Sequence, residues 1–538
     1  MKIKSTTLYA LLLGCVLLLR GFTLETVDLL DPTETRYATI SANMNATGDY
    51  LTPMLVSGDA MDTYFSKPPL HYWLTSVSFH LFGVDEWSAR LLRFLALLLI
   101  SACLIVLGRN LVGVEVGLLA ALMHASCPLV FYMAGGSHVD MTFAAWITLA
   151  LTSFILLMEL ELTRAKRNEL SILLAVASAA AFVTKGPLGL ILIAGPPAIW
   201  MVLTRSRHKL KLLNWPLVIL FLVGLGAPWF YLVELKNPGF LEYFFLHENF
   251  LRYIKHDYGG RHGANHTKPY GFIWVILAVG VLPFIVPFVL QSVKVLRTRV
   301  RALFHADQRL FFFLIWGLLP AAFFTLSSSI LPAYLLPGLP GLCLAMAVLI
   351  HADQKVFTPG RAQVARDLAP ACILLGLTFT GVILDAAWWS IAVSTGMVVA
   401  IFLLAQKMSV QRLSDLCARR AVVVSVFLTV AVMIFTPSIN GNKSSEQVLD
   451  LVCLEAPSEI PRVAVISAIN QSPFWMERAW RNELGKEVVV KAFSVPDLLK
   501  SNWPNLIHRT KHGEIPLELQ AVYRKEASAG SWSWYVRI

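Results

Sequence analysis

Apolar runs of about twenty residues recur through this 538-residue chain, and they limit how it can fold. A helix needs about 20 mostly apolar residues to cross about 30 Å of hydrocarbon, where every backbone polar group must find its partner inside the span. The pattern therefore predicts an all-α polytopic membrane protein with about 13 transmembrane helices. The expected spans cover residues 7–23, 89–109, 114–133, 139–158, 168–184, 187–204, 213–233, 270–293, 309–328, 331–350, 368–386, 388–406 and 420–436.

Composition and charge support this class. Only 15% of the residues are charged, whereas soluble domains carry about 25%, so the composition excludes a soluble protein. The net charge of +11 does not indicate nucleic-acid binding, because the basic residues gather in short loops between apolar runs. Loops of this kind face the cytoplasm, which predicts a cytoplasmic N-terminus and a C-terminal part on the outer side. The loop residues are Arg205, Arg207, Lys209, Lys211, Lys294, Arg297, Arg299, Arg301, Lys407, Arg412, Arg419 and Arg420.

Three segments are long enough to fold outside the bilayer. Residues 24–88 form a first external loop, whose apolar spacing after Pro32 and after Pro68-Pro69 predicts helices lying on the membrane surface. Residues 234–269 form a second external loop. Residues 438–538 contain β-rich stretches and predict a small α/β domain, outside a membrane domain at 1–437.

The first loop is acidic. From Glu25 to Glu86 it holds nine carboxylates against two cations, Arg36 and Lys67. Once the topology is drawn, polar residues from several other loops and span ends should face the same outer surface. The candidate site residues are Asp31, Glu34, Arg36, Tyr37, Tyr64, Lys67, Asp140, Lys185, Arg261, His262 and Tyr334.

A mixed cluster of this kind at the outer face suits group transfer from a lipid phosphate. Carboxylates such as Glu34 or Asp31 orient or deprotonate an acceptor, while Lys67 and nearby arginines bind the phosphate as it leaves. Each residue also has a structural interpretation, because Glu34 and Arg36 can cap a surface helix, Asp140 can cap its span, and lysines can snorkel to the headgroups. We see no glycine pattern for a nucleotide, and we assign no metal ligand.

Several strings resemble the ArnT-like bacterial glycosyltransferases, relatives of the protein O-mannosyltransferases that include the aminoarabinose–lipid A transferases. The strings are TETRYATISANMNATGDYLTP, YFSKPPLHYWLTSVSFHLFGVDEWSARLLR, HVDM, TKGPLG and LPAYLLP, in family order. The resemblance implies the GT-C fold, with about 13 spans, surface helices in the first loop and a C-terminal periplasmic domain. It also implies a bacterial inner-membrane enzyme that takes a sugar from a polyprenyl-phosphate carrier.

The resemblance also transfers residue by residue, with three departures. The matching positions are Arg36, Tyr37, Tyr64, Lys67, Asp140, Lys185 and Tyr334. The family usually has Asp-Glu before its Arg-Tyr, and here the Asp position is Thr33, followed by Glu34, so either Glu34 or Asp31 would supply the essential acid. Ser66 stands where an acid often precedes the lysine, and Ile330 where a lysine is frequent. These differences predict a sugar or an acceptor other than those of the aminoarabinose enzyme.

We therefore expect transfer of a sugar from a polyprenyl-phosphate donor to a lipid A-like or other envelope acceptor at the periplasmic face. One alternative is a protein O-glycosyltransferase of the same fold, which would use exported proteins as acceptors. The other is a lipid or glycan transporter such as a flippase, which the scarcity of charged residues inside the spans disfavours. No cofactor besides the lipid-linked donor is implied with certainty, although a divalent metal would be compatible with the chemistry.

Overall fold

The computed structural model describes most of the chain. It leaves out residues 1–3, 31–32, 58–59, 137, 255–267, 283, 294–307, 328, 353–395, 397–411, 444, 456–459, 466–474, 476–488, 493–494, 510–514 and 530–531. Two of the expected spans, 368–386 and 388–406, lie outside the described residues.

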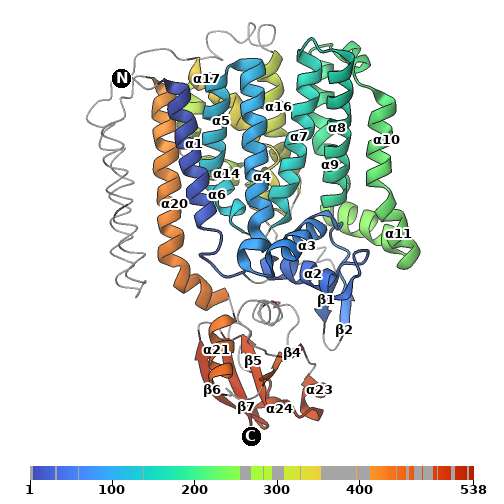
Figure 1. Cartoon of the computed structure of the whole chain (residues 1–538), viewed down its shortest axis with the longest axis vertical. Coiled ribbons are helices and arrows are strands. Elements are labelled where there is room, and N and C mark those ends of the chain that lie inside the picture. The colour runs from blue at the N-terminus through green and yellow to red at the C-terminus, as the bar shows by residue number, and fades with distance from the viewer. Residues whose placement is uncertain are drawn as a thin grey trace.

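A bundle of apolar helices forms the body of the molecule (Figure 1). Its principal helices are α1 (Ser5–Phe22), α4 (Glu86–Leu107), α5 (Val114–Ser126), α6 (Pro128–Ala134), α7 (Val139–Glu159), α8 (Arg164–Lys185), α9 (Pro187–Leu203), α10 (Trp215–Gly226), α14 (Phe272–Gly280), α16 (Gln308–Phe324), α17 (Leu339–His351) and α20 (Leu413–Lys443). Within the described part of the chain, 6 helices are long and apolar enough to cross a membrane, or up to 8 if each bent pair counts as one span. The protein is thus a multi-pass membrane protein, and the count of about 13 spans stays a prediction.

Several expected spans are broken or shortened. The run 114–133 bends by 68° between α5 and α6, because Pro128 begins the second helix and forces Cys127 before it into an extended conformation. The run 270–293 bends by 107°. The run 331–350 becomes a short 3₁₀ turn, Pro332–Leu335, followed by α17, so only its second part is α-helical.

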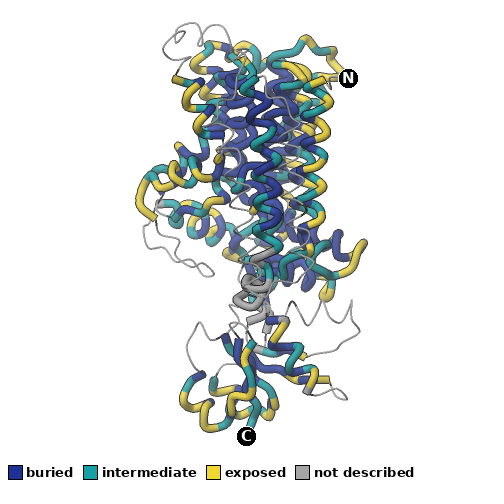
Figure 2. The backbone as a smooth tube through the Cα atoms, turned by 90° about the vertical axis from the view of Figure 1, so that its left-hand side faces the viewer, coloured by how far each residue is buried: buried dark blue, intermediate teal, exposed yellow. Residues whose placement is uncertain are grey.

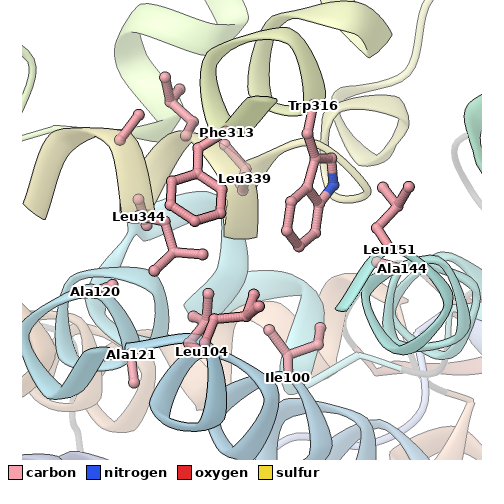
Figure 3. Close-up of a cluster of buried hydrophobic side chains, with 14 of the residues drawn as sticks. Ile100, Leu104, Ala120, Ala121, Ala144, Leu151, Phe313, Trp316, Leu339 and Leu344 are labelled. Atoms are coloured by element: carbon pink, nitrogen blue, oxygen red, sulfur yellow. The ribbon is translucent and has the colours of Figure 1, made fainter. Parts of the chain in front are cut away.

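The core of the bundle lies between α4, α5, α7, α16 and α17. Figure 2 shows buried residues along the middle of the bundle, and Figure 3 shows Phe313 and Trp316 of α16 facing Leu104 of α4. Close helix approach depends on small residues here. A Cβ on Gly108 would lie 2.3 Å from the Cα of Gly117, so α5 can pack against the end of α4 only while both positions are glycine.

The first external loop folds into two helices and a hairpin. The expected surface helices are α2 (Thr33–Thr47) and α3 (Leu70–Phe82), and the hairpin that the sequence did not predict pairs β1 (Met54–Ser57) with β2 (Ala60–Thr63). The loop ends at a capping box in which Asp85 accepts from the Ser88 backbone N–H, which starts α4. The loop is therefore a folded layer at one end of the bundle.

The second external loop is also helical where it is described. Its described elements are α12 (Phe240–Glu242), a π-helix η3 (Tyr243–Leu251) and α13 (Arg252–Ile254). They follow α11 (Pro228–Lys236), which together with α10 makes one candidate span over Trp215–Lys236, close to the predicted span 213–233. At the opposite end of the bundle, the basic loop after α9 contains the 3₁₀ helix η2 (Arg207–Leu212). π-helices are rare in proteins, and those that occur are often found at functional sites.

The C-terminal part is a mixed five-stranded sheet with short helices. Its elements are α21 (Glu446–Glu455), β3 (Arg462–Val465), β4 (Val489–Ala492), α23 (Val495–Lys500), β5 (Asn505–Arg509), α24 (Leu517–Gln520), β6 (Tyr523–Ala529) and β7 (Trp532–Arg537). The strand order is β4-β3-β5-β7-β6, with β3 parallel to β4 and β5 and the rest antiparallel. The predicted small α/β domain is confirmed as a fold, whereas α20 runs through the predicted boundary at residue 437.

The sheet lies beyond the same end of the bundle as α2 and α3, and α1 begins at the opposite end (Figure 1). Trp475 joins the two parts: its ring centroid is 5.7 Å from that of Phe79 in α3, and its indole N–H donates to Glu86 at the start of α4 at 2.9 Å. This contact places the C-terminal sheet against the first loop.

Candidate active site

A cavity of about 150 Å³ opens where the first loop, α8, the π-helix and the segment before α17 meet. Its lining combines cationic and hydroxyl side chains with aliphatic and aromatic ones. The residues are Lys67, Lys185, Pro187, Leu188, Ile191, Glu248, Asn249, Arg252, Tyr253, Phe323, Phe324, Ser327, Ser329 and Tyr334. The lining of the cavity is therefore partly charged and partly apolar.

Local sequence explains how two of the cations reach it. Lys67 lies in the connection between β2, which ends at Thr63, and α3, which begins directly after Pro68-Pro69, and its ammonium group donates to the Ser66 carbonyl at 2.7 Å. Lys185 is the last residue of α8, where the helix dipole favours a positive charge. Lys185 is therefore placed by a helix end, whereas Lys67 is placed by the short connection before α3 and by its bond to Ser66.

Asp140, which does not line the cavity, fixes the position of Lys185. It lies in the first turn of α7, where the helix dipole favours an anion, and its carboxylate is bonded to the Lys185 ammonium group. The Lys185 nitrogen also lies 4.7 Å from the centroid of the Tyr334 ring. This contact is a cation–π interaction, so an acid and an aromatic ring on two other elements position one lysine.

Gly186 lets the π-helix approach this lysine. Its φ of +74° is strained for any other residue, and a Cβ there would lie 2.7 Å from the ring of Phe244. Phe244 belongs to the π-helix, whose Glu248 and Asn249 line the cavity. The glycine thus allows the second loop to close the site.

Glu248 bridges the remaining two cations. Its carboxylate lies 3.4 Å from the Lys67 nitrogen and is bonded to the Arg252 guanidinium one helical turn later. Burial lowers the pKa of the Lys67 ammonium group, while the nearby Glu248 charge opposes part of that effect. Among the described lining residues, three cations therefore face one carboxylate, which leaves an excess of positive charge.

The structure brings four predicted residues together: Lys67, Lys185 and Tyr334 line the cavity, and Asp140 is bonded to one of them. Arg36 and Tyr37 of α2 form a separate cluster with Tyr64, and none of the three lines the cavity. The Arg36 guanidinium lies 5.8 Å from the Tyr64 ring centroid.

Glu34 lies elsewhere. It is buried, its carboxylate is 3.2 Å from the Arg90 guanidinium, and it accepts from the Leu30 backbone N–H at 2.8 Å. Its carboxylate therefore faces α4 and does not line the cavity, and its catalytic role stays a prediction. The other predicted residues, Asp31, Arg261 and His262, lie outside the described part of the chain.

Sequence reasoning missed Glu248 and Asn249. The spacing of Glu248 and Arg252 at i and i+4 was a usable signal, because such pairs meet on one helix face. It could not show that the pair faces Lys67, which is far away in the sequence. Within the described ranges, no three His, Cys, Asp or Glu side chains gather in a way that could hold a metal ion.

Comparisons with known proteins agree with the sequence motifs. Residues 6–244 match the family model described as dolichyl-phosphate-mannose-protein mannosyltransferase. The undecaprenyl phosphate-alpha-4-amino-4-deoxy-L-arabinose arabinosyl transferase of Yersinia enterocolitica serotype O:8 / biotype 1B is 32% identical over 324 residues, which are 59% of this chain and 55% of that protein. The protein of the same name from Pectobacterium carotovorum subsp. carotovorum is 32% identical over 358 residues, 65% and 59% of the two chains. The chain thus matches little more than half the length of these relatives.

The fold likeness extends over the whole chain. The crystal structure of ArnT from Cupriavidus metallidurans bound to undecaprenyl phosphate matches with a TM-score of 0.76 at 22% identity and covers 99% of both chains. The apo form matches with a TM-score of 0.74 at 21% identity. The predicted GT-C architecture, helical with a small C-terminal α/β domain, is confirmed. In sequence over its N-terminal part, and in fold over nearly its whole length, the chain is similar to these proteins.

Proposed function

We propose that this protein is a membrane glycosyltransferase that moves a sugar from a polyprenyl-phosphate carrier to an envelope acceptor. The observation that carries the proposal is the convergence of Lys67, Lys185 and Arg252 on one cavity. Cations in such a site form charge-assisted hydrogen bonds to phosphate oxygens, which are about twice as strong as neutral ones. The names of the relatives point to the same donor chemistry.

The apolar side of the cavity supports a lipid-linked donor. Leu188, Ile191 and Phe323 line it, and Ile191 on α9 is 46% exposed on the outer surface of the bundle. A polyprenyl chain would leave the site past these residues while its phosphate stayed among the cations. No nucleotide has to enter from water.

In the proposed reaction, the acceptor oxygen attacks the anomeric carbon, the bond from that carbon to the phosphate oxygen breaks, and the electron pair stays on the phosphate. A phosphate acceptor is already ionised and has no proton to lose, whereas a hydroxyl acceptor would pass its proton to a carboxylate, for which Asp31 is the candidate. Lys67 and Arg252 stabilise the charge that develops on the leaving phosphate. Tyr334 and Asp140 position Lys185 for the same purpose. Asp31 remains the first-loop candidate for orienting the acceptor, and we assign Glu34 a structural role beside Arg90.

For the acceptor we propose a lipid A-like glycolipid of the bacterial envelope. A second lipid would reach the cavity from the same leaflet as the donor. The charged groups also argue against a transporter, because Asp140 and Lys185 lie at helix ends at one end of the bundle and not midway along it.

We further propose that residues 1–437 form the catalytic membrane domain of an inner-membrane enzyme and that residues 438–538 lie in the periplasm. The N-terminus would be cytoplasmic. The basic 3₁₀ helix η2 supports this orientation, since its Lys209 pairs at 2.8 Å with Glu159, the last residue of α7. That end of α7 lies opposite Asp140, so the basic loop and the cavity are at opposite ends of the bundle.

The test is sugar transfer from a radiolabelled polyprenyl-phosphate sugar by the purified protein in lipid vesicles. Lys67→Ala and Lys185→Ala should each lower kcat/KM by about 10- to 100-fold, as expected for the loss of a hydrogen bond to a charged group. Lys166→Ala is the matched control, because this lysine is exposed and pairs with Glu169 at the far end of α8. Wild-type rates for both site variants would refute the proposal. Mass spectrometry of lipid A and of exported proteins from cells with and without the gene identifies the acceptor. A gene-dependent sugar on exported proteins, and not on lipid A, would contradict the proposed lipid acceptor and indicate a protein acceptor.

A further inference from the structure

Glu248 is a buried carboxylate inside a cavity that we propose binds phosphate. It is 6% exposed, lies 3.4 Å from the Lys67 nitrogen and is bonded to Arg252. Both partners are cations that the donor phosphate would contact. A negative charge in this position weakens phosphate binding, so its presence calls for a physical reason.

One part of the reason concerns the enzyme before the donor binds. A buried cation without a partner is strongly destabilising, and Glu248 neutralises two of them at once. Lysine offers three N–H donors and arginine five, so a phosphate can bind the same cations while some of their donors remain on the carboxylate. The carboxylate and the phosphate then compete for shared donors throughout the catalytic cycle.

The other part concerns the change in phosphate charge during transfer. The donor is a phosphodiester with one negative charge. When the bond between the anomeric carbon and the phosphate oxygen breaks, the electron pair stays on oxygen, and the product is a phosphomonoester whose second pKa is about 6. At neutral pH the product therefore carries nearly two charges, and a purely cationic site would hold it more tightly than the donor.

We propose that Glu248 is a positioning residue that selectively weakens binding of the polyprenyl-phosphate product and so speeds its release. The inference rests on the proposed function. Coulomb repulsion from one fixed charge scales with the charge of the ligand, so Glu248 disfavours the phosphomonoester more than the phosphodiester. Asp140 does not share this role, because it is bonded to Lys185 from outside the cavity lining.

The experiment uses the full-length protein in lipid nanodiscs. The dissociation constant of a short-chain polyprenyl phosphate and that of an unreactive polyprenyl phosphodiester are measured by calorimetry, and turnover of the sugar donor is followed with and without added product. In Glu248→Gln the ratio of diester to monoester dissociation constants should rise about tenfold over the wild type. Product inhibition should become stronger, and kcat should fall more than KM does.

Two further variants separate this role from a loss of folding. Glu159→Gln is the matched control, because Glu159 also bridges two cations, Lys209 at 2.8 Å and Arg309 at 3.2 Å. Glu159 is the last residue of α7, at the end of that helix away from Asp140 and the cavity. The ratio of diester to monoester dissociation constants should therefore stay at the wild-type value in this variant. Glu248→Asp withdraws the carboxylate by one methylene and should give an intermediate ratio. It is the measurement to use should Glu248→Gln fail to purify as a folded protein.

The outcomes separate the two proposals. A wild-type protein that binds neither phosphate ligand and transfers no sugar overturns the proposed function itself. A wild-type protein that binds both, with an unchanged ratio in the folded Glu248 variants, overturns only the role of Glu248. A raised ratio with stronger product inhibition supports it.

Discussion

Replacing Glu34 by glutamine distinguishes a structural acid from a catalytic one. Glu34 and Arg90 are almost fully buried, with side chains 4% and 2% exposed and a nitrogen–oxygen distance of 3.2 Å. At an effective dielectric constant near 20, two unit charges at this distance attract by about 5 kcal/mol. Removing one partner of a buried pair costs about 3–5 kcal/mol, because the other charge stays buried without compensation. We expect Glu34→Gln to lose an amount in this range.

The position of Arg90 explains why this loss concerns folding. Its guanidinium also donates to the backbone carbonyls of Leu24 and Asp28, at 2.6 Å and 2.9 Å, and so ties the start of the first loop to α4. Glutamine keeps the shape and can still accept from the Leu30 N–H, so the variant removes charge without opening a cavity. The transfer activity per folded molecule should stay within a few-fold of wild type.

The assay is unfolding in detergent with increasing urea, combined with transfer activity measured well below the transition. A double-mutant cycle with Arg90→Met isolates the pairwise interaction free energy. Glu169→Gln is the control, since this exposed acid pairs with an exposed lysine and should change stability by less than about 1 kcal/mol. If Glu34→Gln unfolded at the wild-type urea concentration yet transferred no sugar, our structural assignment would be wrong and Glu34 would be a catalytic residue.

Two further predictions concern the cavity and the C-terminal sheet. Burial lowers the pKa of Lys67, so its ammonium group should lose its proton at a lower pH than an exposed lysine does, and donor binding should weaken as the pH rises through that pKa. Lys67→Arg stays protonated and should shift this loss of binding to higher pH. A pH profile of KM in which the loss stays at the same pH would contradict this. Trp475→Ala should lower the free energy of unfolding by about 3–5 kcal/mol, because it removes the contact with Phe79, and limited proteolysis should then release the C-terminal part faster. Trp215→Ala is the control, because this residue on α10 is 45% exposed, and it should not change the cleavage rate. Equal cleavage rates for the two variants would show that Trp475 does not hold the sheet in place.

Local sequence was sufficient for much of the architecture. The apolar runs predicted α7 nearly to the residue and α8 except for its first four residues, since a helix in lipid must satisfy its own backbone and its length is set by the bilayer. The apolar spacing after Pro32 and after Pro68-Pro69 predicted helices where α2 and α3 lie. The residues near helix ends, Lys67, Asp140 and Lys185, were found for the same reason, because outward-facing span ends gather on one side of the molecule.

Other features depended on contacts between distant segments. The run 114–133 was predicted as one span, although Pro128 within it was a usable signal for the break between α5 and α6, where the chain bends by 68°. The hairpin β1–β2 has only four residues in each strand, too short for a clear alternating pattern.

What the sequence by itself determined is therefore the class of the protein, the placement of its main helices and the side of the molecule on which its polar residues meet. The tertiary structure alone decided which of those residues share a cavity. Glu34 and Lys67 lie in the same acidic loop, yet one pairs with Arg90 and the other with Glu248. The physical reason is that helical periodicity and bilayer thickness act over a few residues to one span, whereas the partner of a buried charge is fixed by packing between distant elements, which here are 56 and 181 positions apart.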